Sequence, residues 1–301
     1  MPYTVVTVSH ALDQPLLELQ ACSLHRFLDD RDGFVSSIVV IDNSDEGELD
    51  RTRLFNCYGR LAPRVRFMQA CAFGAFPHTA GWYRQQALKL MVARTIETPR
   101  YIVLDAKNHL VNPLSRAYLE TVDGQFMRSY VRNFQQHPLR AYFESTCRYF
   151  RIDEAAIRKF MPPITPFVLS ASVVRELIEY VEAREKTIFS YAFLERARSK
   201  QMTEFALYAG YLLHTYGDFS DLYRFDGQEC PVIWQFSDKS EAARRLAEAR
   251  ESPFLAVHRN AFATFDRDTT HAVARLWQTR GLFQSKEQAC SFIEACAQRF
   301  G

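Results

Sequence analysis

Short runs of β-branched and other apolar residues alternate with helix-like segments in the first third of the chain. The apolar runs occupy residues 4–8, 37–41, 65–68 and 101–105, and each is typical of a buried strand. Between them, apolar positions recur at helical spacing, most regularly over 81–96. This alternation predicts a Rossmann-like α/β domain with a mostly parallel central sheet flanked by helices.

The rest of the chain is less regular. Residues 161–170 should be extended, because Pro162, Pro163 and Pro166 do not fit within a helix. Ser172 is placed to cap a helix that ends near residue 186. Residues 123–160 give no clear pattern. The remaining predicted elements are helices over 203–216 and 239–250, strands over 230–236 and 254–257, and two tail helices separated at Gly281.

Polar residues stand where the predicted strands end. They are Thr7 and His10 after the first strand, Asp42 and Asn43 after the second, and Asp105, Lys107 and Asn108 after the fourth. Parallel strands end on one edge of a sheet, where open α/β sheets bind ligands. We therefore expect these side chains to converge on a site for a nucleotide or a diphosphate. The structural alternative is that Asp105 caps a turn and Lys107 points to solvent.

The predicted helix over 81–96 carries a polar stripe. Trp82, Gln85, Gln86 and Lys89 follow the spacing i, i+3, i+4 and i+7, which places them on one face. Two amides and an ammonium on one face suit a ligand that carries hydroxyls and phosphate. The alternative is an ordinary solvated face, although a tryptophan at its start makes that alternative less favourable.

Two further groups are candidates for the site. Glu204 lies in the first turn of its predicted helix, with Tyr208 and Tyr211 one and two turns later. Aromatic rings beside a carboxylate are typical of sugar-binding grooves, but the helix dipole alone also favours an acidic residue there. His258 and Arg259 follow the strand over 254–257, where a histidine can bind a metal, contact a phosphate or cap a turn.

Composition narrows the class of protein. A net charge of +2 and the lack of a basic block argue against nucleic-acid binding. The 7 cysteines are irregularly spaced, so we expect reduced thiols and a cytoplasmic location. No apolar run is long enough to span a bilayer. Association at the inner face of a membrane is left open. The sequence lacks the motifs of P-loop enzymes, Rossmann dehydrogenases, α/β-hydrolases and zincins.

Five stretches in order along the chain carry a resemblance. They are 81–90 (GWYRQQALKL), 101–113 (YIVLDAKNHLVNP), 165–170 with the helix after it, 203–211 (TEFALYAGY) and 257–259 (VHR). Together they resemble bacterial glycosyltransferase-like proteins with the GT-A fold. The resemblance implies one domain over 1–267, with a nucleotide-sugar-binding half at 1–115 and an acceptor-side half at 116–267. Residues 268–301 would form a helical appendix.

The resemblance also implies roles for the candidate residues. Donor-binding residues would be Thr7, His10, Asp42, Asn43, Trp82, Gln85, Gln86, Lys89, Asp105, Lys107, Asn108, His258 and Arg259. Tyr208 and Tyr211 would face the acceptor, and Glu204 would act as base or positioning group. Asp105 matches the first aspartate of the Asp-x-Asp motif of such enzymes, but Lys107 replaces the metal-binding second one.

We therefore expect a glycosyltransferase that moves a sugar from a nucleotide-sugar donor to a glycan or lipid-linked acceptor, a precursor of cell-surface polysaccharide. No cofactor is predicted; Mn²⁺ or Mg²⁺ is disfavoured by Lys107, and any such ion would be held by Asp105 and His258. The rival hypothesis is a non-catalytic nucleotide- or glycan-binding protein that keeps the fold. A nucleotidyltransferase fits less well, because the loop after the first strand is neither glycine-rich nor basic.

Overall fold

A five-stranded sheet forms the centre of the protein. The computed structural model describes residues 1–28, 33–45, 48–77, 81–157 and 159–301. The strand order is β3-β2-β1-β4-β9, in which the first four strands are parallel and β9 runs antiparallel to β4. The strands are β1 (Tyr3–Ser9), β2 (Val35–Asp42), β3 (Val65–Gln69), β4 (Arg100–Leu104) and β9 (Phe167–Ser170). The predicted class, an α/β protein with a mostly parallel sheet flanked by helices, is confirmed.

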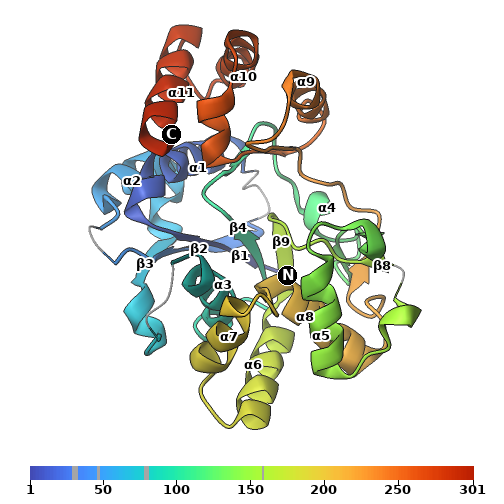
Figure 1. The fold of residues 1–301 in the computed structure, drawn as a ribbon. Helices are drawn as coiled ribbons and strands as arrows, with labels where there is room; N and C mark the ends of the chain where they lie inside the picture. The colour runs from blue at the N-terminus through green and yellow to red at the C-terminus, as the bar shows by residue number, and fades with distance from the viewer. Residues whose placement is uncertain (29–32, 46–47, 78–80, 158) are drawn as a thin grey trace.

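Helices cover both faces of this sheet (Figure 1). One face carries α1 (Gln14–Phe27) and α2 (Arg51–Tyr58), and the other carries α3 (Gly81–Met91), α6 (Ala171–Glu185) and α7 (Phe189–Arg198). Every residue of β1 and β4 is buried, which explains their continuous apolar runs, since strands of a parallel sheet are covered on both sides.

The second half adds a helical layer and several short strands. Helix α8 (Glu204–Tyr216) packs closely on α5 (Arg140–Phe150). The contact leaves no room for a side chain at Gly210, since a Cβ atom there would lie 2.3 Å from the side chain of Thr146. The short elements are α4 (Arg116–Leu119), β6 (Met127–Arg128), β7 (Arg132–Asn133), β8 (Lys159–Phe160) and β10 (Tyr223–Arg224).

A small second sheet brings the end of the domain back to the end of β4. Its order is β11-β12-β5, with β5 (Asn108–Leu110) antiparallel to β12 (Phe254–Val257). The strand predicted over 230–236 is mostly wrong: β11 contains only Val232–Ile233. The chain then turns, because Ser237 accepts a hydrogen bond from the amide of Trp234 (3.0 Å) and donates its own amide to the Trp234 carbonyl (3.0 Å).

Several predicted helix boundaries also differ, most clearly those of the helices over 81–96 and after residue 170. The α-helical part of 81–96 ends at Met91 and continues as a short 3₁₀ turn, Val92–Arg94. Helix α6 begins at Ala171, so Ser172 lies inside it and does not cap it. The hydroxyls of Ser170 and Ser172 instead lie 3.1 Å apart, within hydrogen-bonding distance.

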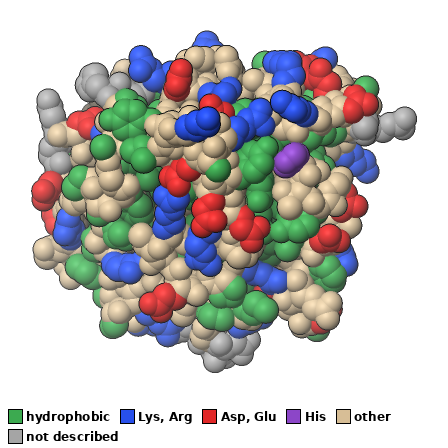
Figure 2. Space-filling model, turned by 90° about the horizontal axis from the view of Figure 1, so that it is seen from below, with side chains coloured by type: hydrophobic (Ala, Val, Ile, Leu, Met, Phe, Trp, Pro, Cys, Tyr) green, Lys and Arg blue, Asp and Glu red, His purple; other side chains and the backbone are tan. Residues whose placement is uncertain are grey.

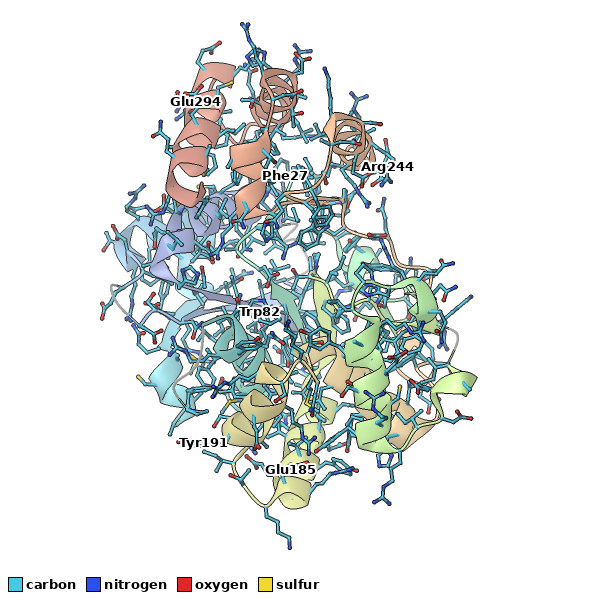
Figure 3. All side chains as sticks on the ribbon, viewed as in Figure 1. Phe27, Trp82, Glu185, Tyr191, Arg244 and Glu294 are labelled. Carbon is cyan, nitrogen blue, oxygen red and sulfur yellow. The ribbon has the colours of Figure 1, made fainter. Side chains whose placement is uncertain are left out.

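The tail helices pack onto the domain. The two tail helices, α10 (Arg267–Thr279) and α11 (Lys286–Phe300), lie beside α9 (Lys239–Glu248) at the top of Figure 1, and they are separated at Gly281 as predicted. Their outer faces carry charged side chains such as Arg244 and Glu294 (Figure 3). On the inner side, Trp277 is fully buried in the same hydrophobic core as the sheet.

Trp277 makes a polar contact with the loop that follows β4. Its indole Nε1 donates to Nε2 of His109 over 2.8 Å. Nδ1 of His109 must then carry the ring proton, and it lies 3.3 Å from the carbonyl oxygen of Lys107. Burial lowers the pKa of His109 to about 4, so the imidazole is neutral at physiological pH. The tail thus supports the backbone of Lys107 through one neutral histidine.

The surface carries both signs of charge. The face at the bottom of Figure 1 shows lysine and arginine side chains interspersed with aspartate and glutamate (Figure 2). Across the described ranges, no helix has the length and apolar character needed to cross a membrane.

Acid should destabilise the fold through His109. In the unfolded chain a histidine binds a proton near pH ~6.5, whereas folded His109 stays neutral until about 4. The unfolded state therefore holds more protons in this window. The free energy of unfolding should fall as the pH falls from about 6.5 to about 4. Above about pH 6.5, the full stabilisation that comes from neutral His109 should be present. Urea unfolding at a series of pH values measures the slope.

The variant His109→Gln isolates this effect, because a glutamine oxygen can still accept from Trp277 but does not titrate. Its slope should be shallower than that of the wild type by up to one proton, or about 1.4 kcal/mol per pH unit. Equal slopes for the two proteins would contradict a buried, neutral His109.

Candidate active site

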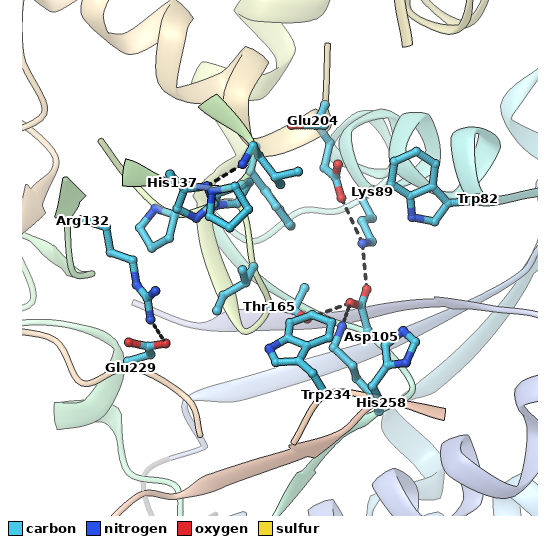
Figure 4. Close-up of a pocket in the computed structure, with 18 of the residues that line it drawn as sticks. Trp82, Lys89, Asp105, Arg132, His137, Thr165, Glu204, Glu229, Trp234 and His258 are labelled. Atoms are coloured by element: carbon cyan, nitrogen blue, oxygen red, sulfur yellow. Dashed lines mark hydrogen bonds and ion pairs between the residues drawn. The ribbon is translucent and has the colours of Figure 1, made fainter. Parts of the chain in front are cut away.

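The site is organised around the carboxylate of Asp105, directly after β4. Nζ of Lys89 on α3 lies 2.7 Å from Oδ1 of Asp105 and 3.0 Å from Oε1 of Glu204 at the start of α8. The other oxygen, Oδ2, accepts from the Thr165 hydroxyl over 2.9 Å and pairs with the ammonium of Lys107. Figure 4 shows Lys89 between the two carboxylates. The last turn of α3, the end of β4 and the start of α8 therefore meet at one group of charged side chains.

The loop after β4 is held rigidly by buried hydrogen bonds. The Asn108 side-chain oxygen accepts from the amide of Asp105 over 2.8 Å, and its nitrogen donates to the Thr165 carbonyl over 3.2 Å. Gln20 on α1 donates to the carbonyls of both Asp105 (2.7 Å) and Asn108 (2.9 Å). Asn108 is fully buried, so its side chain shapes the loop and does not face a ligand.

The pKa shifts of Lys89 and Asp105 keep both side chains in their ionised forms. Burial on its own would lower the pKa of Lys89, but Asp105 and Glu204 outweigh it and raise that pKa. Burial would raise the pKa of Asp105, but Lys107 and Lys89 hold it well below its usual range. The group consists of two lysines, Lys89 and Lys107, and two acids, Asp105 and Glu204. Its formal net charge is zero.

Lys89 is more buried than its place on a polar stripe suggested. It is only 5 % exposed, and its ammonium also lies 5.4 Å from the centre of the Phe205 ring. Lys107 is not directed freely to solvent either, since it pairs with Asp105 and lies 5.7 Å from the centre of the Trp234 ring. The alternative that Lys89 lies on a solvated helix face is therefore wrong. The alternative that Lys107 points to solvent is also wrong.

Two cavities meet at this group. We call the first the edge cavity; it has a volume of about 610 Å³ and lies along the carboxyl ends of the strands. The second, the α8 cavity, has a volume of about 470 Å³ and lies beside the start of α8. The residues that line both are Trp82, Lys89, Asp105, Lys107 and His258.

The edge cavity is mainly polar. Besides the shared residues, it is lined by His10, Asp13, Leu16, Gly81, Gln85, Ala106, Gln235, Arg259 and Asn260. Nη1 of Arg259 lies 3.1 Å from Asp13, and Nε2 of His10 lies 3.3 Å from the same carboxylate. Gln85 donates its amide to the Val8 carbonyl over 2.9 Å. The predicted residues His10, Gln85 and Arg259 thus lie together here.

His258 is a neutral residue of the site. Burial, followed by the nearby charges of Lys107 and Arg259, lowers its pKa to about 4. Nδ1 of His258 accepts a hydrogen bond from the amide of Asn260 over 3.3 Å. At physiological pH the ring can therefore offer its remaining Nε2–H as a hydrogen-bond donor but does not supply a positive charge.

The α8 cavity is more apolar. Its own lining consists of Arg132, His137, Pro138, Leu139, Pro162, Pro163, Ile164, Thr165, Thr203, Glu204, Phe205, Glu229, Trp234, Phe236 and Arg245. Arg132 and Glu229 pair at the end opposite to Lys89 (Figure 4). Glu204 is brought into the cavity by the start of α8, where the Thr203 hydroxyl caps the helix by accepting from the Ala206 amide.

Besides Asn108, three predicted strand-end residues line neither cavity. Thr7 is fully buried and donates to Gln20 over 2.8 Å. Asp42 accepts from the amides of Ser44 and Leu49, each over 3.0 Å, and so shapes the loop after β2. Asn43 donates to the Gly81 carbonyl over 2.9 Å and binds Arg84. The strand ends do converge, but these side chains are used to hold the loops.

Gln86, Tyr208 and Tyr211 are also placed outside the two cavities. Gln86 is 2 % exposed and, within the described residues, its amide has no hydrogen-bond partner. The Tyr208 hydroxyl is buried, 3.0 Å from that of Tyr223, and Tyr211 packs against Phe150 and Tyr180. The aromatic lining of the α8 cavity comes instead from Trp82, Phe205, Trp234 and Phe236, of which the last two lie in the stretch predicted as a strand.

The side chains present do not fit a divalent cation. Nowhere in the described part of the chain do three or more His, Cys, Asp or Glu side chains gather as metal ligands. Each oxygen of Asp105 already faces an ammonium, which cannot ligate a cation. The next acid along the chain, Glu120, pairs with Arg100 and Arg116 at the opposite end of the sheet.

The chain is similar to one family model and to several solved structures. A family model described as "Family of unknown function (DUF6492)" matches residues 13–279, and a search of curated proteins finds no match. Similar solved structures include the WbbM bifunctional glycosyltransferase, the galactosyltransferase LgtC with donor and acceptor sugar analogs, and mouse xyloside xylosyltransferase 1.

The sequence identities to these three structures are 13%, 12% and 11%, and the TM-scores are 0.49, 0.46 and 0.46. The matches cover 85%, 82% and 78% of this chain. They cover 95% of LgtC and 89% of the xylosyltransferase but only 45% of WbbM, so the chain spans less than half of that bifunctional protein.

Replacing Lys89 with methionine should strongly destabilise the protein. The variant keeps a side chain of similar length but leaves the carboxylates of Asp105 and Glu204 buried near each other without a shared cation. Removing one partner of a buried ion pair typically costs about 3–5 kcal/mol. Chemical denaturation measures the loss.

The matched control is Lys239→Met. Lys239 is 64% exposed and pairs with Asp268 on the surface, where a salt bridge contributes about 0–1 kcal/mol. The double variant Lys89→Met/Glu204→Gln should regain part of the lost stability, because one unpaired carboxylate is removed. Equal stabilities for the two single lysine variants would show that Lys89 does not hold these elements together.

Proposed function

The chain belongs to DUF6492, a family of unknown function, and we propose that it is a nucleotide-sugar-dependent glycosyltransferase. The observation that carries the proposal is that two cavities meet at one group of charged side chains. A transferase must hold two substrates so that their reacting atoms lie next to each other. The resemblance of the site sequences to glycosyltransferase-like proteins of the GT-A fold favours sugar as the group transferred.

The edge cavity is proposed to take the nucleotide-sugar donor. It lies at the carboxyl ends of parallel strands, the usual ligand position in such sheets. Lys107 is its cation nearest the shared carboxylate of Asp105, and a lysine is a good partner for phosphate. Lys107 would neutralise the diphosphate in place of a metal ion. Arg259 and Gln85 offer further donors for hydroxyls and phosphate.

The α8 cavity is proposed to take the acceptor, with Glu204 at its boundary with the donor. In the reaction, an acceptor hydroxyl loses its proton to Glu204 as its oxygen bonds to the anomeric carbon of the donor sugar. The bond from that carbon to the diphosphate breaks, and the nucleoside diphosphate leaves with the electron pair. General-base assistance of this kind typically contributes ~10²–10⁴-fold. The resemblance favours a glycan or lipid-linked acceptor on the path to a cell-surface polysaccharide.

A second candidate function rests on one specific feature. Lys89 bridges Asp105 and Glu204, and this ion pair occupies the carboxylate proposed as the base. A protein that had lost transfer and only bound nucleotide or glycan would tolerate such a bridge. Transfer itself therefore decides between the two candidates, whereas ligand binding does not.

Donor binding should be independent of divalent metal. A thermal-shift panel of nucleotides and nucleotide-sugars, with Mn²⁺ or with excess chelator, tests this; a donor at ~100 Kd should add about 2.7 kcal/mol of stability. Lys107→Met should weaken diphosphate binding far more than binding of the nucleoside alone. Stabilisation that appears only with Mn²⁺ would contradict the role given to Lys107.

Glu204→Gln should lower the rate of transfer by ~10²–10⁴-fold and keep donor binding. The substitution preserves the shape of the side chain and removes its charge, so the variant has no base for the acceptor hydroxyl. Product formation measured with the best donor of the panel reports on transfer, and the thermal shift reports on binding. Glu251→Gln, at an exposed glutamate, is the matched control. Full transfer by the Glu204 variant would exclude this residue as the base.

A further inference from the structure

The turn after β11 separates the two cavities. Trp234 and Phe236 line the α8 cavity, and Gln235 between them lines the edge cavity. The turn is held by reciprocal hydrogen bonds between Trp234 and Ser237, each 3.0 Å long. Successive side chains of one fixed turn are thus directed to opposite sides of the junction.

The two aromatic rings on this turn lie almost parallel. Their planes differ by 6° and their centres are 6.0 Å apart. The ring of His258, 5.4 Å away, supports Trp234. Phe236, by contrast, is 78% exposed, the most exposed aromatic side chain in the described part of the protein. Leaving so large an apolar side chain in water forgoes the stabilisation that its burial would give.

Charged groups share the cavity with this aromatic surface. The ammonium of Lys107 lies 5.7 Å from the centre of the Trp234 ring, and Glu204 and Asp105 line the same cavity. A pyranose ring has the matching chemistry: its faces present C–H groups, and its edge presents hydroxyls. A purely apolar ligand would displace water from these charged groups without replacing its hydrogen bonds, and a small ion would not cover the rings. The volume of about 470 Å³ is within the usual range for small-molecule sites.

We propose that Trp234 and Phe236 form a platform on which a pyranose ring of the acceptor stacks, with its hydroxyl edge towards Glu204. This inference rests on the proposed function, because it assigns the acceptor class of the same site. The platform would fix the plane of the acceptor ring, and the fixed plane would select which hydroxyl reaches the donor. Sugars with an axial hydroxyl that interrupts the C–H face should then stack less well.

Saturation-transfer NMR on the full chain tests the platform. The probes are methyl pyranosides of glucose, galactose and mannose, with cyclohexanol as an apolar ring of similar size. At least one pyranoside should bind, more tightly than cyclohexanol, and Phe236→Ala should raise its Kd by about tenfold or more, as expected for the loss of one stacked ring. Phe236→Tyr should keep binding, because it retains the aromatic face.

Phe55→Ala, at another exposed phenylalanine, should leave the Kd unchanged. Three results would overturn the platform: no pyranoside binds, cyclohexanol binds as tightly, or Phe236→Ala binds the sugars as the wild type does. Nucleotide-sugar binding and transfer are measured separately. Transfer to an acceptor without a sugar ring would overturn the platform and keep the transferase, whereas pyranoside binding without transfer would overturn the transferase and keep the platform.

Discussion

The ammonium of Lys89, held between the carboxylates of Asp105 and Glu204, is the interaction on which the site depends. It joins the last turn of α3, the end of β4 and the start of α8, of which α8 lies far from the other two in the sequence. Its burial removes the shielding that water would provide, so each charge requires the others to be present. The same group forms the boundary between the two cavities. On the proposed function, stability and substrate placement would therefore rest on the same side chains.

Much of the fold follows from the sequence because the strands are buried on both faces. Continuous apolar runs such as the one in β1 cannot be mistaken for half-exposed strands, and the helices between them require parallel order. The stretch over 230–236 is equally apolar, but it makes only a two-residue strand, because the Ser237 side chain closes a turn there. A local hydrogen bond of this kind leaves no trace in hydrophobic periodicity.

For the site, the sequence predicts residue types better than their positions. Asp105, Lys89 and Glu204 were all candidates, and they lie in contact. Helical spacing places Gln86 near Lys89 and Tyr208 near Glu204, but it does not say which neighbour packs on that face, and both are buried away from the cavities. The burial of Lys89 was equally unpredictable, because its carboxylate partners come from other elements. Tertiary packing decides these points.

The tail helices help to hold the loop that carries Lys107. Trp277 fixes the proton of His109 on Nδ1, and that nitrogen faces the carbonyl of Lys107. The loop is therefore supported from the tail side by His109 and from α1 by Gln20. If a lysine takes the place of a metal ion, such support is needed, because a flexible ammonium has no coordination geometry of its own. The rigid loop would supply the positional control that a bound cation otherwise gives.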